Sequence, residues 1–396
     1  MRSPHATLRA TVVAGAVLVT TVVAAGCRTE SSASPTSPAT TSPTTSTPTT
    51  VPEPLDLEVV DGAPFPADRC ALNRAAGTIV YLSSFDFAAT ASIVDVLVAE
   101  ERGYYDELCL DVELRPSFSV DNYPLVAAND AQFSSGGSFS EIVDFAGAND
   151  AGFVALAVEG RTGIDALLVT DPQVESLDDL DGAVIGVKGA VTPSVRAMLA
   201  AAGLTEGAQY DTVLLDGFDP LLHASVPGIA GFPVYKSNEP LRLDAAGVDY
   251  RLFDPSDAGV PGSFGIVYTN QTFLEEHPTA AEDFMRATMR GLAEAIADPA
   301  AAGEIAVNTI NDGGNAMNLS PAGEIARWEV ETELIVDGVR SDAPLGVPIV
   351  DQLEAEVAAY AAVGLFEGVV PDISSMVDPT VVAALYDDGE LIWPSP

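Results

Sequence analysis

The sequence predicts an α/β protein with largely parallel strands in two lobes. Apolar runs of strand length alternate with segments of helical spacing from residue 78 onward, and a second cycle of the same kind begins near residue 175. After residue 270 the pattern is mostly helical. Of the 396 residues 47% are hydrophobic, which is enough for a sizeable core in one large domain or two medium ones.

The first cycle begins near Thr78, where we expect the folded part to start. Helices are expected at residues 92–105 and 138–145, because Ser92 with Asp95 and Ser138 with Glu141 each have the spacing of a capping box. Apolar strand runs lie at residues 78–84, 111–117, 131–137, 153–159 and 165–170.

The second cycle contains two helices with clear boundaries. Ser176 caps a short one, and Thr192 followed by Pro193 begins another that Gly203 ends; residues 239–247 also have helical spacing. Strand runs lie at residues 183–189, 212–219, 228–232, 249–253 and 264–270, and later helices at 280–297, 321–336 and 349–363. Crossovers near Thr170 and Phe264 would place a ligand cleft between two lobes, outside the carboxyl ends of the strands.

The N-terminus is typical of an exported protein. A basic start at residues 1–9 precedes a short apolar run at 10–25, which is shorter than a membrane span and reads as a secretory signal. The sequence VAAGC ending at Cys27 resembles the lipobox of bacterial lipoproteins, although Ala24 stands where Leu is usual. In that family the Cys carries the lipid; the alternative is ordinary secretion.

These patterns divide the chain into five parts. Residues 28–54 are almost wholly Ser, Thr, Pro and Ala, a composition that favours an extended linker over a packed core. We expect a signal peptide at 1–26, a lipid-anchored linker at 27–54, the first part of lobe 1 at 55–168, lobe 2 at 169–263, and the return to lobe 1 with C-terminal helices at 264–396.

Charge and cysteine content restrict the partners. The formal net charge of −41 disfavours nucleic acid and anionic lipid heads as direct ligands, although an acidic bias of the whole proteome would give the same charge. With Cys27 as the lipid carrier, Cys70 and Cys109 remain and can form a disulfide in an oxidising compartment. Two buried free thiols are the alternative.

Four strand ends carry candidate ligand-binding residues. Asp86 and Phe87 follow the first strand run and suit a flat ring with N–H donors, while a pair of core Phe residues is the structural alternative. The exposed N–H groups of two helix starts favour an anion or a carbonyl oxygen. The alternative at the first start is that Ser138 merely caps the helix, and the alternative at the second is that Lys188 is a chance surface lysine. The first start comprises Ser135, Gly136, Gly137 and Ser138, and the second Lys188, Gly189 and Thr192.

The fourth candidate is the segment GFPVYKSNEP at residues 231–240. Phe232 and Tyr235 would form one wall of the cleft, and Glu239 would accept N–H groups from the ligand. A capping Glu and a packed aromatic side chain are the alternative. The histidines offer no metal site, since His223 and His277 have no plausible metal partners and His5 lies in the signal. No cofactor, metal or hydrolase motif is expected.

Several segments resemble one family in order and spacing. LVAEERGYYDELCLDVEL at residues 97–114 resembles a signature of the solute-binding lipoproteins of ABC importers, in the branch that binds thiamine pyrimidine precursors and, more distantly, sulfonates, nitrate and riboflavin. The resemblance extends over most of the chain from Thr78 to Tyr386. Further matching segments lie at residues 175–199, 231–240, 256–278 and 284–299.

The resemblance implies a type-II periplasmic-binding-protein fold with two hinge crossings that closes on its ligand. Asp86 and Phe87 stand at the Asp-Trp pair of the precursor-binding members, and Glu239 stands at the Glu of their NEP-like motif. The Asn-rich stretch of the family is replaced by residues 89–93. Ile93 stands where the pyrimidine synthases of this fold have a substrate His, so we expect no enzyme activity.

Together these features predict an extracytoplasmic solute receptor anchored to the outer face of the cell membrane. Its partners would be an ABC permease and its ATPase, and monomer is the family default. We expect a small heteroaromatic ligand, with a thiamine pyrimidine precursor first, riboflavin second and an organic sulfonate or nitrate-type anion as the rival. An exported enzyme of the same fold and a surface interaction protein without a small ligand are the other hypotheses.

Overall fold

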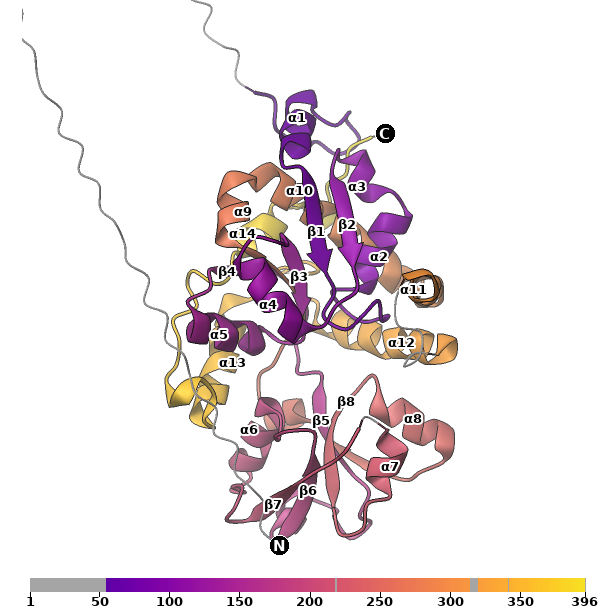
Figure 1. Ribbon diagram of the computed structural model, residues 1–396, viewed down its shortest axis with the longest axis vertical. Coiled ribbons are helices and arrows are strands. Elements are labelled where there is room, and N and C mark those ends of the chain that lie inside the picture. The colour runs from indigo at the N-terminus through magenta and orange to yellow at the C-terminus, as the bar shows by residue number, and fades with distance from the viewer. Residues whose placement is uncertain (1–54, 218, 314–319, 341, 396) are drawn as a thin grey trace, which may run out of the picture. The chain divides into compact units, whose positions relative to one another are not determined.

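Two lobes, each built on a five-stranded sheet, form the folded body (Figure 1). The computed structural model describes residues 55–217, 219–313, 320–340 and 342–395. The signal peptide, the lipid-carrying Cys27 and the linker expected from the sequence lie outside the described residues. Within them, no helix combines the length and apolar character needed to span a membrane.

The sheet of lobe 1 comprises β1 (Thr78–Leu82), β2 (Asp111–Arg115), β3 (Phe133–Gly136), β4 (Phe153–Gly160) and β10 (Phe264–Asn270). The strand order is β2-β1-β3-β10-β4; the first three strands are parallel, and β10 is antiparallel to both of its neighbours. Successive side chains of β1 enter two different cores, Ile79 on one face and Val80 on the other. Burial on both faces explains why these strands read as unbroken apolar runs.

The sheet of lobe 2 comprises β5 (Asp165–Val169), β6 (Ala183–Val187), β7 (Tyr210–Leu214), β8 (Gly231–Tyr235) and β9 (Arg251–Phe253). Its order is β7-β6-β8-β5-β9, with β5 antiparallel to β8 and β9. The chain crosses between lobes at residues 161–164 and 254–263, and the antiparallel strand of each sheet is the first one after a crossing. This topology is the type-II periplasmic-binding-protein fold, as predicted. The expected boundary between residues 168 and 169 falls inside β5.

Most helices pack around lobe 1. They are α1 (Ala67–Ala75), α2 (Val94–Glu101), α3 (Tyr104–Glu107), α4 (Ser119–Ala127), α5 (Phe139–Asn149), α9 (Gln271–Glu276), α10 (Pro278–Ala297), α11 (Pro299–Gly313), α12 (Pro321–Gly338), α13 (Val350–Ala362) and α14 (Pro379–Ala383). The long helix α10 lies at the centre of the larger core, where the rings of Phe133 and Phe284 stack with centroids 3.9 Å apart. A short hairpin of β11 (Tyr386–Asp387) and β12 (Glu390–Leu391) ends the fold.

Lobe 2 carries three α-helices among the described residues: α6 (Pro193–Ala201), α7 (Pro220–Ala224) and α8 (Glu239–Ala246). As predicted, Thr192 is the N-cap residue of α6, Pro193 is its first residue, and Ser176 forms a capping box at a short 3₁₀ turn. Apolar clusters cover both faces of this sheet as well.

Three local predictions from the sequence are wrong. The folded part of the chain begins before Thr78, because helix α1 precedes β1. Ser92 does not cap α2: its φ of 60° places it in the left-handed region, and its Oγ donates to the carbonyl oxygen of Ala91. The strand expected at residues 228–232 is β8, which begins later, at Gly231.

One disulfide joins Cys70 in α1 to Cys109, which precedes β2. It ties the N-terminal helix to the body of lobe 1 across 39 residues of sequence. In the chain-entropy model, closing a loop of this length stabilises the fold by up to about 4 kcal/mol.

Candidate ligand-binding site

The segments that contain the predicted site residues lie at the two sheet edges from which the chain crosses between lobes. Parallel strands place their carboxyl ends at one edge, so the segments after β1, β2 and β3 adjoin in lobe 1 and those after β6 and β8 adjoin in lobe 2. Only residues 161–164 separate the end of β4 from the start of β5. Because an extended residue spans at most about 3.6 Å, the two edges approach closely at the crossings.

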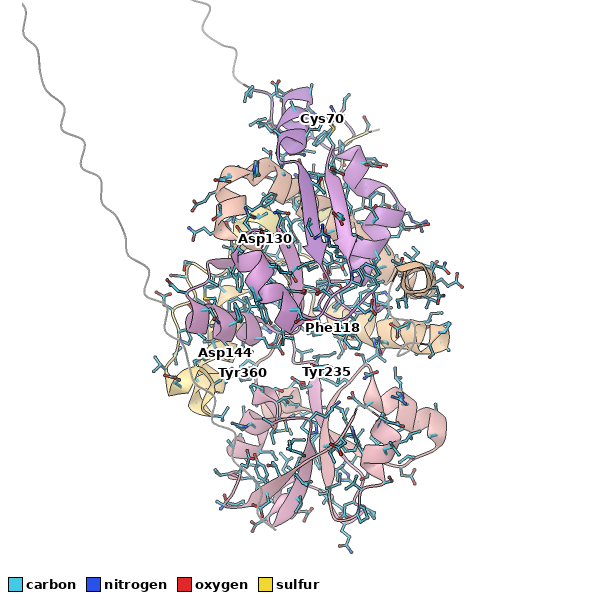
Figure 2. The ribbon with its side chains drawn as sticks, viewed as in Figure 1. Cys70, Phe118, Asp130, Asp144, Tyr235 and Tyr360 are labelled. Atoms are coloured by element: carbon cyan, nitrogen blue, oxygen red, sulfur yellow. A yellow bond between two sulfur atoms is a disulfide. The ribbon has the colours of Figure 1, made fainter. Side chains whose placement is uncertain are left out.

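Three aromatic side chains on these edges are accessible. Phe85 after β1 and Phe118 after β2 are 42% and 44% exposed, and their rings meet edge to face with centroids 5.9 Å apart. Tyr235 at the end of β8 is 49% exposed. Figure 2 shows Phe118 at the margin of lobe 1 and Tyr235 on the facing margin of lobe 2. These rings present stacking surfaces from both lobes.

The two phenylalanines predicted to stack on a ligand lie elsewhere. Phe232 is 1% exposed, and its ring packs in the core of lobe 2 against His223. Phe87 is buried in the larger core of lobe 1. Both positions correct the sequence prediction, because a ring inside a core presents no face to a ligand. The structural alternative of packed rings holds for both.

Asp86 is held tightly beside Phe85. Its φ is 51°, its N–H donates to the carbonyl oxygen of Ser117 at 2.8 Å, and its Oδ1 accepts the N–H of Phe87 at 2.9 Å. The left-handed backbone turns the chain so that Phe85 points outward while Phe87 points into the core. The position of Asp86 at the strand edge fits the prediction; its contact with a ligand stays a prediction.

The predicted anion site at the start of α5 is filled by the protein itself. Ser138 caps the helix, since its Oγ accepts the N–H of Glu141 at 3.4 Å. The N–H of Phe139 donates to Ser263 Oγ, and that of Ser140 to Glu356 Oε1, both at 3.0 Å. The carboxylate of Glu356 therefore stands where we expected a ligand oxygen.

The other residues of that strand end are packed inward. Ser135 Oγ accepts the N–H of Ser84 at 2.7 Å. A Cβ on Gly136 would come within 2.9 Å of the side chain of Ile142, and one on Gly137 within 2.9 Å of a carboxylate oxygen of Glu141. The β3–α5 turn thus lies close to its own helix at Gly136, whereas at Gly137 only the flexible end of the Glu141 side chain is near.

Glu239 is held by its own lobe. It is buried, its Oε1 pairs with Lys188 Nζ at 2.7 Å, and its Oε2 accepts the N–H of Tyr235 at 2.9 Å. Lys236 pairs in the same way with Asp254 at 2.5 Å. Gly189 has a φ of 123°, a conformation that favours glycine in the turn between β6 and α6. Both lysines thus have carboxylate partners in lobe 2.

Sequence reasoning missed an acidic group at the crossings. Glu141 of α5, Asp165 at the start of β5 and Glu356 of α13 each raise the pKa of another member of the group through charge repulsion. Burial is the largest cause for the half-buried Asp165 and the fully buried Glu356, and their pKa values rise to about 7, whereas Glu141 is exposed.

A side chain of α13 is hydrogen-bonded to both crossings. Gln352 Nε2 donates to the carbonyl oxygens of Arg161 at 2.5 Å and Gly262 at 3.1 Å, one from each crossing. The crossings touch: a Cβ on Gly262 would lie 2.6 Å from the backbone nitrogen of Gly163 and 3.3 Å from the hydroxyl of Tyr360. Glycine is needed here because two backbones pass in contact.

A second connection between the lobes runs through α12. Ser237, in the turn after β8, donates to Glu331 Oε1 at 2.7 Å, and Arg327 donates to Asn238 Oδ1 at 3.0 Å. Arg327 also lies over the ring of Phe85, 5.8 Å from its centroid. The turn in GFPVYKSNEP therefore docks on a C-terminal helix of lobe 1.

Comparison with known proteins identifies the family. The model of the family described as NMT1/THI5 like matches residues 90–302, which is more than half of the chain. The chain belongs to the NMT1/THI5-like family. This result confirms the resemblance found in the sequence, since the matched region contains both crossings and all of lobe 2.

Proteins similar in sequence or in fold to this NMT1/THI5-like protein are named for different solutes. The riboflavin-binding protein RibY of Chloroflexus aurantiacus is 24% identical over 258 residues, which cover 63% of this chain and 70% of that protein. The putative periplasmic sulfonate-binding protein SsuA of Methylobacillus flagellatus has a TM-score of 0.56 and 18% identity, covering 77% of this chain and 93% of that one. The periplasmic nitrate-binding protein NrtA of Synechocystis PCC 6803 has a TM-score of 0.55 and 13% identity. The match covers 78% of this chain and 87% of that one.

The described residues of this family member contain no group of three or more His, Cys, Asp or Glu side chains arranged to hold a metal ion. Of the predicted residues, the structure brings Asp86, Tyr235, Lys188 and Glu239 to the facing edges and buries Phe87 and Phe232. A closer reading of the strand ends could have found two of these residues. Phe118 directly follows one predicted strand, and Asp165 is the first residue of another. Glu356 gives no such signal, because it reaches the site from a helix 216 residues after its partner Ser140.

Proposed function

We propose that this protein is the solute-binding component of an ABC importer and binds a small heteroaromatic compound between its lobes. The observation that carries the proposal is the set of accessible rings on both facing edges, Phe85 and Phe118 in lobe 1 and Tyr235 in lobe 2. Rings of this kind stack on a planar ligand with centroids about 4.5–7 Å apart. Two hinged lobes that close on the ligand would present a new surface to a permease and its ATPase.

Carboxylates beside the rings favour a ligand with N–H donors. Asp86 lies at the edge of lobe 1, and Glu141 and Asp165 lie at the crossings. A thiamine pyrimidine precursor combines a flat ring with amino groups, and a flavin combines a larger ring with one imide N–H. The similarity to a riboflavin-binding protein supports a planar heteroaromatic ligand.

A sulfonate or nitrate-type anion is the second candidate, because sulfonate- and nitrate-binding proteins share the fold. The electrostatics oppose it. Glu356 already occupies the start of α5, and both lysines of the chain are paired with carboxylates. An anion entering here would meet Glu141 and Asp165 without an uncommitted lysine to balance them.

We propose further that the protein binds its ligand without changing it and acts outside the cell membrane, tethered by a lipid on Cys27. Ile93, at the position of the family's substrate His, is fully buried in the core. The Ser/Thr/Pro-rich residues 28–54 would let the folded body reach the permease from the anchor.

Titration of the purified protein tests the proposal. The probes are 4-amino-5-hydroxymethyl-2-methylpyrimidine, riboflavin and methanesulfonate. Calorimetry measures the dissociation constant of each probe, and thermal unfolding measures the stabilisation that it gives. A ligand present at 100 times its dissociation constant should add about 2.7 kcal/mol to the free energy of unfolding. Binding of methanesulfonate alone, or a new product in the mass spectrum, would overturn the proposal.

A matched pair of variants locates the site. We expect Phe118→Ala to weaken binding of the heteroaromatic about tenfold, since it removes an accessible stacking ring. Val120→Ala, on the neighbouring helix α4, is the control: this side chain is highly exposed and lies outside the proposed stacking pair. Equal affinities for the wild type and Phe118→Ala would show that the rings do not hold the ligand.

A further inference from the structure

We propose that Arg327 of α12 is a positioning residue that couples the ring of Phe85 in lobe 1 to Asn238 in lobe 2. A planar ligand that stacks on Phe85 then favours the arrangement in which the lobes are joined at this point. The inference rests on the proposed function, since Phe85 belongs to the proposed stacking surface. It adds the residue that transmits ligand stacking to the contact between the lobes.

The guanidinium of Arg327 is in contact with three other residues. The side chain is buried; Nη1 donates to both carboxylate oxygens of Glu324 at 2.8 and 2.7 Å, and Nη2 donates to Asn238 Oδ1 at 3.0 Å. Its Cζ lies 5.8 Å from the centroid of the Phe85 ring, within the range of a cation–π contact. Because the donors of a guanidinium are fixed in one plane, Arg327 cannot turn without breaking one of these contacts.

One face of α12 also holds the segment that follows this ring. Glu324 Oε2 accepts the N–H of Ala89 at 2.8 Å, and Glu331 Oε2 accepts the N–H of Ala91 at 2.7 Å. Glu324, Arg327 and Glu331 are spaced by three and four residues, so their side chains lie on the same face of the helix. The ring and the backbone after it are therefore both attached to α12, and a shift of one should shift the other.

The lobe 2 end of the contact is a side chain that does not fill its usual role. Asn238 is the N-cap residue of α8, but its side chain caps no N–H of that helix. Asn is favoured at this position because its own oxygen accepts an N–H of the first turn. Pro240, the second residue of α8, has no N–H, which leaves that of Leu241 as the usual partner. The oxygen is turned to Arg327 instead.

Asn238 therefore has two alternative partners. With the lobes joined, its Oδ1 accepts from Arg327; with the lobes apart, rotation of the same side chain would let it cap α8. The exchange lowers the free-energy difference between the two arrangements, so that ligand stacking on one lobe can bias the equilibrium between them. The contact is thus suited to being made and broken.

The turn also fixes Asn238 relative to the ring of Tyr235. Glu239 Oε2 accepts the N–H of Tyr235 at 2.9 Å, and the N–H of Asn238 donates to the carbonyl oxygen of Tyr235 at 3.0 Å. Figure 1 shows α12 along the margin of lobe 1 that faces α8, and the two helices are in contact. The accessible rings of the two lobes are therefore connected through Arg327 and Asn238.

An arginine that only neutralises Glu324 is the simpler alternative. The two residues are three positions apart on one helix, and such a pair stabilises the helix whether or not a ligand is bound. In that case a change at Asn238 in lobe 2 should leave the segment around Phe85 unaltered. The two roles therefore differ in what a substitution in lobe 2 does to lobe 1.

Amide exchange of the unliganded full chain tests the coupling without any ligand. Asn238→Ala removes the acceptor of Arg327 Nη2 and leaves the buried pair with Glu324 intact. We expect exchange at residues 85–91 to become at least about threefold faster, while exchange in the core strand β4 stays unchanged. Arg242→Met removes an exposed arginine of α8 that has its own carboxylate partner, and should leave both unchanged. Unaltered exchange at residues 85–91 in Asn238→Ala would overturn the proposal.

A double-mutant cycle shows whether Arg327 acts through the ring. The probes are riboflavin and 4-amino-5-hydroxymethyl-2-methylpyrimidine, and calorimetry gives their dissociation constants. Arg327→Met should weaken binding about fivefold in the otherwise unchanged protein, and by less than about twofold when Phe85→Ala is already present. An equal loss in both backgrounds would show that Arg327 does not act through Phe85, and the proposal would fail.

A second route keeps the buried charge of Glu324 paired, because loss of Arg327 could prevent folding. Asn238→Ala should weaken binding of the same probes about threefold. Asn238→Asp, which retains an acceptor for Arg327, should bring the affinity back to within about twofold of the wild type. If Asn238→Asp binds no better than Asn238→Ala, the acceptor at this position is not what matters, and the proposal is wrong.

The outcomes separate the coupling from the proposed function. If neither heteroaromatic probe binds the wild type, the proposed function falls, and the exchange measurement alone decides whether Asn238 is coupled to the segment around Phe85. If a probe binds and Asn238→Ala leaves exchange at residues 85–91 unaltered, the proposed function stands and the coupling falls.

Discussion

At the scale of single residues, one buried carboxyl group occupies the helix start where the sequence predicted an anion site. Glu356 caps the start of α5 from inside the molecule, through the N–H of Ser140. A helix start that binds an internal carboxylate no longer attracts an external anion, because the partial positive charge there is already balanced. In this protein the start of α5 is therefore filled by a carboxylate of its own chain.

Burial of Glu356 should make the stability of the protein depend on pH. Its pKa is raised to about 7, so this group stabilises the fold most below its ordinary pKa and loses that contribution as pH rises through 7. Glu356→Gln should match the wild type near pH 5 and exceed its free energy of unfolding by roughly 2–3 kcal/mol at pH 8. Urea unfolding at both pH values measures the difference, with Asp144→Asn as control. An equal difference at pH 5 and pH 8 would contradict the assignment.

Sequence reasoning about residues succeeded where the signal was local. The cap at Ser138 and the N-cap position of Thr192 follow from neighbours within four residues. Phe87 and Phe232 were predicted to face a ligand but lie in the cores. Whether a ring is exposed depends on which face of the sheet other elements cover, and the local sequence does not show this. Glu356 was beyond reach, since its role arises from packing between α13 and α5.

At the scale of elements, α12 links the lobes away from the crossings. Its buried Glu331 accepts hydrogen bonds from Ala91 in lobe 1 and from Ser237 in lobe 2. Burial is the largest cause that raises the pKa of Glu331. Any rotation of lobe 2 must break or carry along the contact between α12 and the turn after β8.

Removing one hydroxyl should loosen this connection. We expect Ser237→Ala to lower the free energy of unfolding by about 1 kcal/mol or slightly more, because a buried carboxylate loses a donor. Amide exchange in α12 should rise at the same time. Ser225→Ala, which removes an exposed hydroxyl from lobe 2, should leave both quantities unchanged. Unaltered exchange in α12 after Ser237→Ala would show that the contact does not restrain the lobes.

Elements with strong periodicity were predicted well, and others were missed. The alternation of strands and helices located most strands, and helical spacing located α10, α12 and α13. No specific prediction was made for α1, α4, α7 (Pro220–Ala224), α9, α11 or α14. In α4 an internal Pro124 obscures the helical pattern, and tertiary packing decides the outcome.

At the scale of the whole molecule, the two crossings act as one joint. Gly163 and Gly262 touch, and Gln352 binds the carbonyl oxygens of both crossings. Two backbones in contact supply one axis of the kind about which hinged lobes close, and the contact of α12 with the turn after β8 opposes rotation about it.

A methyl group at the joint should disturb it. In Gly262→Ala the new Cβ would lie 2.6 Å from the backbone nitrogen of Gly163, so the crossings must move apart. We expect a loss of about 1–3 kcal/mol in the free energy of unfolding and a changed radius of gyration in solution scattering. Gly147→Ala in α5, with open space around its Cβ, should be neutral or slightly stabilising. Identical scattering curves for Gly262→Ala and the wild type would rule out this view of the joint.

The overall fold was predictable, and its internal boundaries were less so. Two cycles of strands and helices predicted two lobes, but the first boundary was placed inside β5 instead of before it. The reason is that β5 pairs antiparallel with β8 and β9, and periodicity does not reveal which sheet a strand joins.

The connectivity of lobe 2 makes it a replaceable cassette. Both ends of the folded body belong to lobe 1, where the N–H of Gly62 donates to the carbonyl oxygen of Trp393 at 2.9 Å. Lobe 2 leaves and re-enters at adjacent points, Gly163 and Gly262. Because these points adjoin, we expect that a few glycines could join them in place of lobe 2, although the buried Glu331 would then lose its donor Ser237.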